Sequence, residues 1–140
     1  MKRLVYKKPD GRITILIPSP KFENNIQHVR ERNEAINPNT PASDYVCECD
    51  HTELPQSREF RGQWRIKDGK VEVDPVLETE ERWKRIRIER NKRLDESDKS
   101  MLRIQETEPA KSGVWKTYRQ ELRDVTEQSD PKNIVWPVEP

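Results

Sequence analysis

The chain has 140 residues, of which 38% are charged and 31% hydrophobic, and its mean hydropathy is −1.15. So low a hydrophobic fraction excludes a large buried core and predicts a small, soluble protein with much exposed helix and loop. A net charge of +1 excludes a strong overall field for nucleic acid or anionic lipid. No apolar stretch reaches the length of about 18 residues that a membrane span needs.

The N-terminal residues predict a β-hairpin. Residues 4–6 and 13–17 carry mostly aliphatic and β-branched side chains, and the run PDG at residues 9–11 has the chemistry of a tight turn. A helix is expected over residues 24–36, and the run rich in Asn and Pro that follows is expected to end it. A third strand is expected over residues 45–49.

A second hairpin is predicted near the middle of the chain. Its strands are residues 64–66 and 71–73, and Asp68-Gly69 is at its tip. Residues 1–74 are therefore expected to form a small antiparallel β-rich unit with one helix.

The composition changes at Asp74-Pro75, which are typical of a helix cap followed by a first helical turn. A very charged helix is expected from residue 78 to about 96, supported by pairs of acidic and basic residues four positions apart. Residues 98–109 look irregular, and a second helix is expected from about 110 or 112 to 126. Residues 75–140 are thus predicted to be a helical hairpin with an apolar C-terminal tail, and the fold class is α+β.

Metal, cofactor and catalytic sites are not expected. Cys47, Cys49, Asp50 and His51 are close in sequence, but no second Cys or His pair completes a tetrahedral zinc site. The two cysteines share one face of a strand at a spacing that would strain a disulfide. No nucleophile motif and no phosphate-binding glycine loop occurs, so we expect a protein that is not an enzyme.

A basic block lies in the first predicted helix of the hairpin. Residues 82–93 hold seven Lys and Arg residues and one acid, Glu89, a composition that could follow a phosphate backbone. The cations are spread around the helix and acids flank the block, which favours a solvated helix face. Nucleic-acid binding remains an alternative.

Aromatic side chains gather in the C-terminal part. Trp115, Tyr118, Leu122 and Val125 have the 3, 4, 3 spacing of one helix face, and the tail contributes Trp136. The favoured interpretation is a core. A helix pair this small also leaves aromatic surface exposed, which can bind a partner.

Three segments of the C-terminal part are familiar as a combination. Residues 90–98 read RNKRLDESD, residues 115–125 read WKTYRQELRDV and residues 134–137 read IVWP. Over about residues 80–140 the chain resembles the phage tail assembly chaperone family. It departs from the family pattern at Lys99, where members usually carry Trp. Residues 1–74 resemble, more loosely, small phage and prophage proteins of unassigned role.

The resemblance implies that the protein shields a phage tail component, such as a tape measure or fibre protein, before the tail is built. Its partner would be that tail protein, and it would act in the cytoplasm of the bacterial host. A structural virion protein of the tail or neck is an alternative with the same sequence features. The candidate partner-binding residues are Trp83, Trp115, Tyr118, Arg119, Leu122, Arg123 and Trp136. The two arginines lie one helical turn apart and could pair with carboxylates of the bound protein.

Overall fold

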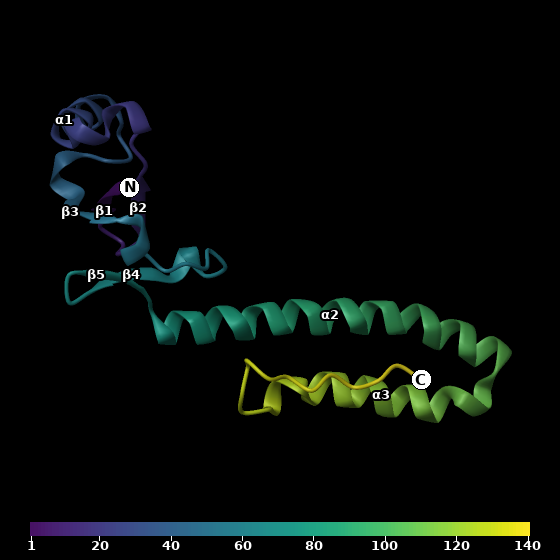
Figure 1. Cartoon of the computed structure of the whole chain (residues 1–140). Coiled ribbons are helices and arrows are strands. Elements are labelled where there is room, and N and C mark those ends of the chain that lie inside the picture. Colours follow the sequence, from purple (N-terminus) through teal and green to yellow (C-terminus); the bar gives the residue numbers. More distant parts are fainter. The chain divides into compact units, whose positions relative to one another are not determined.

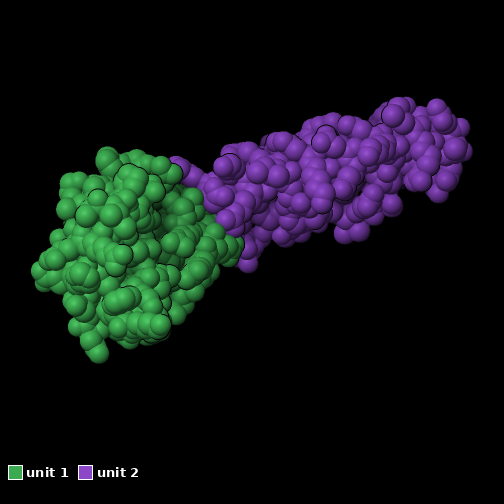
Figure 2. Space-filling model, turned by 90° about the horizontal axis from the view of Figure 1, so that it is seen from above, with its two compact units in different colours: residues 1–78 green, residues 79–140 purple.

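The computed structural model describes all 140 residues. The chain divides into two compact units, residues 1–78 and residues 79–140 (Figures 1 and 2). The first unit combines antiparallel strands with a helix and the second is helical, which confirms the predicted α+β class. None of the helices combines the length and the apolar character that crossing a membrane requires.

The first unit contains a three-stranded antiparallel sheet in the order β2-β1-β3. Strands β1 (Lys2–Lys7) and β2 (Ile13–Leu16) form the predicted N-terminal hairpin, and β3 (Tyr45–Asp50) pairs with the other edge of β1. The middle residues of β1, 4–6, are fully buried because this strand has a neighbour on each side. Gly11 closes the turn at a φ of +85°, a conformation that favours a residue without Cβ.

Strands β4 (Trp64–Lys67) and β5 (Lys70–Val73) form the second predicted hairpin. Its tip residues Asp68 and Gly69 both have positive φ, at 50° and 77°, as a two-residue turn between twisted strands requires. The hairpin contributes buried Trp64 and Val71 to a core with Val5 of β1. Partly buried side chains complete that core: Ile13, Ile15, Cys47, Cys49, Leu54, Ile66 and Val73.

Both cysteines are free thiols on the half-buried face of β3. Burial raises the pKa of Cys47 and of Cys49 above the ordinary thiol value, and nearby acidic groups add to the effect. The two side chains pack against the core of Val5, Trp64 and Val71. A packing role therefore accounts for both thiols.

Helix α1 (Ile26–Ile36) begins slightly later than predicted, because Pro20–Asn25 form a 3-10 turn before it. The helix is tied to the sheet through Tyr6, whose hydroxyl donates to the Glu34 carboxylate at 3.2 Å. Arg30 donates to the same carboxylate at 2.8 Å. The Glu34 carboxylate thus links Tyr6 of β1 to helix α1.

Helix α2 (Pro75–Thr107) begins at the predicted cap. The Asp74 carboxylate accepts hydrogen bonds from the backbone N–H groups of Val76 and Leu77, both at 3.0 Å. Two predicted pairs of side chains four residues apart are present further along: Arg85 with Glu81 at 3.2 Å and Arg93 with Glu89 at 2.8 Å.

The prediction that this helix ends near residue 96 and that residues 98–109 are irregular is wrong. Helix α2 continues without a break for 33 residues, and α3 (Ser112–Asp124) folds back beside it (Figure 1). The reason is tertiary packing. Leu94, Met101 and buried Ile104 lie against the aromatic face of α3, and Ser97 fits between them with its hydroxyl bonded to the Leu94 carbonyl at 2.7 Å.

Candidate partner-binding surface of the helical hairpin

The aromatic face of α3 forms the core of the second unit. Trp115, Tyr118 and Leu122 are 6%, 6% and 0% exposed, and they form one cluster with Ile104 of α2. The rings of Trp115 and Tyr118 meet edge to face, with their centroids 5.8 Å apart. Contacts within the hairpin therefore fill this face, as the core interpretation expects, and a partner could reach it only if the hairpin opened.

Arg119 lies at the centre of the hairpin. Its guanidinium ion-pairs with Asp98 of α2 and donates to the Ser97 hydroxyl at 2.6 Å. By contrast, Arg123 is exposed, and its guanidinium donates only to the neighbouring Gln120 side chain, at 3.4 Å. Of the two arginines suggested by the sequence, Arg123 alone is free to meet a second protein.

The other two predicted aromatic residues are half-buried. Trp83 lies in the part of α2 where Ile86 is buried, and Trp136 of the C-terminal tail packs against the α2–α3 core. The Arg93 guanidinium lies 4.4 Å from the centre of the Trp136 ring, a cation–π contact. The tail thus covers part of the hairpin with one aromatic anchor.

The tail reverses direction at residues 130–133. The Asp130 carboxylate accepts hydrogen bonds from the Lys132 backbone and from the Asn133 side chain, and the latter bond is the main reason why the pKa of Asp130 lies below its ordinary value. Beyond this turn the Gln128 side chain donates to the Val135 carbonyl and accepts from the Val135 N–H, both at 2.9 Å. One amide group therefore holds the returning tail as a neighbouring strand would.

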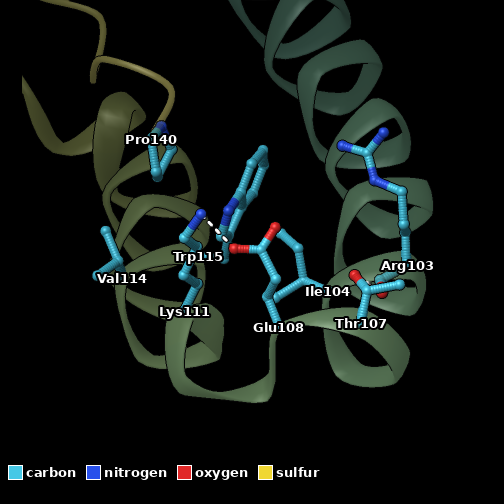
Figure 3. A pocket seen from close by; sticks show the side chains of 8 residues that line it. All are labelled: Arg103, Ile104, Thr107, Glu108, Lys111, Val114, Trp115 and Pro140. Atoms are coloured by element: carbon cyan, nitrogen blue, oxygen red, sulfur yellow. Dashed lines mark hydrogen bonds and ion pairs between the residues drawn. The ribbon is translucent and has the colours of Figure 1, made fainter.

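A pocket of about 730 Å³ lies at the turn between α2 and α3 (Figure 3). Helix ends, the short turn and the end of the tail supply its lining: Arg103, Ile104, Thr107, Glu108, Lys111, Val114, Trp115 and Pro140. Figure 3 shows the Trp115 ring and the Glu108 carboxylate between the two helices, with the Lys111 amine ion-paired to that carboxylate. Val114 is 58% exposed at the edge of the pocket.

The sequence did not indicate this pocket. Arg103, Glu108 and Lys111 lie in or next to the segment expected to be irregular, and Val114 is outside the 3, 4, 3 spacing of the buried face. The only signal in the sequence was a valine directly before the tryptophan of the apolar spacing. This valine could not be assigned to a pocket before the ends of α2 and α3 were known.

The basic block on α2 is partly neutralised within the hairpin. Arg85 and Arg93 are ion-paired, and Arg93 also lies over the Trp136 ring. Lys84, Arg87 and Lys92 are exposed, and acids flank the block on both sides, within residues 78–81 and 95–98. This arrangement favours a solvated helix face over a continuous track for phosphates.

Comparisons with curated proteins and with solved structures gave no match. A comparison with protein-family models gave a match that lies within the second unit and leaves residues 1–82 outside it. The matched part contains α3, the tail and most of α2, and the resemblance predicted for about residues 80–140 is confirmed. Residues 83–140 match the family described as phage tail assembly chaperone protein.

Proposed function

We propose that this chain is a phage tail assembly chaperone-like protein that binds an exposed segment of a tail protein with its helical hairpin, without catalysis. The observation that carries the proposal is the coincidence of the family match, residues 83–140, with the second compact unit, residues 79–140. A tape measure or fibre protein is the expected kind of partner, held in the host cytoplasm until the tail is assembled.

The pocket at the α2–α3 turn is the best surface for this contact. The aromatic core is already filled by the chain itself, whereas the pocket leaves parts of Ile104, Val114 and Trp115 available to a second protein. Its volume of about 730 Å³ accommodates one or two large apolar side chains. The pocket therefore offers an anchor site for an apolar segment.

The charges around the pocket select the chemistry of the bound segment. Lys111 is engaged by Glu108, whereas Arg103 is exposed and forms no ion pair, so its guanidinium can meet an acidic group of a partner. A segment with an apolar side chain followed by a carboxylate would satisfy both features, since guanidinium groups pair well with carboxylates. Arg123 lies elsewhere on α3 and could add a second charge contact.

Co-expression with the tail proteins of the same phage tests this proposal. The full chain and a Val114→Asp variant would each be purified with the tail protein, and the amount bound per chain would be measured. Val114→Asp should reduce binding at least tenfold, because the bound segment would bury a carboxylate that has lost its water. Ile88→Asp is the matched control, since Ile88 is 61% exposed on α2 and does not line the pocket.

Equal loss of binding in both variants, or no loss in either, would contradict the pocket assignment. Mass spectrometry of purified particles separates the assembly role from that of a structural tail or neck protein. A transient assembly protein is expected to be absent from finished particles, so stoichiometric presence of this chain would exclude it.

A further inference from the structure

A second site lies in the first unit, beside the core tryptophan of β4. A pocket of about 30 Å³ is bounded by three arginines and four apolar or aromatic residues: Arg3, Arg58, Arg61, Ile15, Ile17, Leu54 and Trp64. Its volume is close to the space that one water molecule occupies, roughly 30 Å³. A single carboxylate group is of comparable size.

The three arginines have no acidic partner. Arg3 donates to the Lys2 carbonyl at 3.1 Å, and the Arg61 guanidinium lies 5.9 Å from the centre of the Trp64 ring. Neither of them, nor exposed Arg58, forms an ion pair. Three arginines line one small pocket that has no carboxylate among its lining residues, so an anion bound there would be attracted by all three positive charges.

Trp64 supplies the second, independent observation. The residue is 4% exposed, and its Nε1 is the one buried side-chain nitrogen or oxygen of the chain that has no hydrogen-bond partner. A buried N–H without an acceptor is unfavourable, because its hydrogen bond to water is lost and not replaced. The pocket that Trp64 lines therefore combines an unpaired indole donor with three arginines that have no acidic partner, and it lacks an acidic acceptor.

We propose that this pocket binds the carboxylate of an aspartate or glutamate side chain of a partner protein. The guanidiniums and the indole N–H donate to the carboxylate oxygens, and Ile15, Ile17 and Leu54 contact its aliphatic stem. Arg58 and Arg61 are exposed, so a partner can reach their guanidiniums from solvent.

A protein carboxylate fits better than the phosphate of a nucleic acid. Three of the seven lining residues are aliphatic, which suits the aliphatic stem of an acidic side chain better than the ester links of a phosphate. Residues 1–78 also contain equal numbers of basic and acidic residues, so the first unit has no broad positive field to attract a polyanion. We therefore favour a local contact with one acidic side chain over binding of a polyanion.

The proposal does not depend on the chaperone-like role of the hairpin. All seven lining residues lie within residues 3–64, outside the family match at residues 83–140. If a carboxylate binds here while no tail protein binds the hairpin, the carboxylate site stands and the chaperone-like role fails.

Nuclear magnetic resonance on the full chain tests the carboxylate site. The probes are N-acetyl-leucyl-glutamate amide, its glutamine analogue and inorganic phosphate, compared at equal ionic strength. The glutamate probe should shift the Trp64 indole N–H signal downfield with saturation, while the indole signals of the other tryptophans stay in place. Arg58→Gln should weaken this binding about tenfold, as expected when one charge-assisted hydrogen bond is lost.

Arg32→Gln is the matched control, because Arg32 is an exposed arginine of the same unit outside this pocket. It should leave the affinity unchanged. The proposal is overturned if the Trp64 signal does not respond, or responds equally to the glutamine analogue. Saturation by phosphate alone, or equal weakening by both arginine variants, would overturn it as well.

Discussion

The guanidinium of Arg119 on α3 is ion-paired with the carboxylate of Asp98 on α2. The same guanidinium donates to the Ser97 hydroxyl at 2.6 Å and to the Leu94 carbonyl at 3.4 Å. One side chain thus joins the two helices and supplies a donor to Ser97, which is 1% exposed. This polar link lies where the predicted helix was expected to end and α2 instead continues to Thr107.

Replacing Arg119 should destabilise the hairpin. Arg119→Ala removes the ion pair and the donor to a buried hydroxyl, with an expected loss of about 1.5–3 kcal/mol in the free energy of unfolding. Urea denaturation of the full chain followed by circular dichroism measures it. Arg123→Ala is the control, since this exposed arginine makes only a local bond to Gln120, and its effect should stay within about 0.5 kcal/mol. Similar losses in the two variants would show that Arg119 has no special role.

Leu122 should be a stability residue and not a binding residue. It is fully buried in the hairpin core, so Leu122→Ala should lower the free energy of unfolding by about 2–5 kcal/mol through lost contacts and a cavity. Val114→Ala, at a position 58% exposed, should change it by no more than about 0.5 kcal/mol. A Leu122→Ala variant of unchanged stability would mean that this face is not packed as described.

The Gln128 side chain should hold the tail locally. Gln128→Ala removes both hydrogen bonds to Val135, each with a net contribution of about 0.5–1.5 kcal/mol. Hydrogen exchange at the Val135 amide should therefore become faster, while the amides of α3 keep their protection. Gln105→Ala, an exposed glutamine on α2, provides the matched control. If the Val135 amide exchanges equally fast in the unaltered chain, the Gln128 side chain does not hold the tail.

Tyr6 should make the first unit sensitive to alkali. Burial, and then the nearby Glu34 carboxylate, raise the pKa of Tyr6 from 10.0 to about 12. A folded-state pKa above the unfolded value means that its contribution to stability is complete below pH 10 and is lost as the pH rises toward 12. Phenolate absorbance and circular dichroism, followed together between those values, should show ionisation accompanied by loss of structure. Tyr6→Phe should reduce the pH-dependent loss of structure, whereas absorbance changes from Tyr45 and Tyr118, whose pKa values are also raised by burial, should remain. An unchanged loss of structure in that variant would contradict the assignment.

The sequence alone determined the features that rest on local chemistry. The two β-hairpins follow from turn residues that tolerate positive φ, and the start of α2 follows from the Asp74 cap and Pro75. The apolar spacing on α3 marked its buried face, and the motifs of the C-terminal part indicated the family that residues 83–140 match. Each of these signals lies within a few residues of chain.

Only the tertiary structure decided where α2 ends and which surface stays open. Residues 98–107 are helical because Met101 and Ile104 pack on α3 and because Arg119 pairs with Asp98, contacts that join residues far apart in the chain. The same folding filled the aromatic face with the hairpin's own side chains and created a pocket from both helix ends and the tail. Packing between distant segments has no local pattern, so the sequence could name the aromatic residues but not tell which of them a partner can reach.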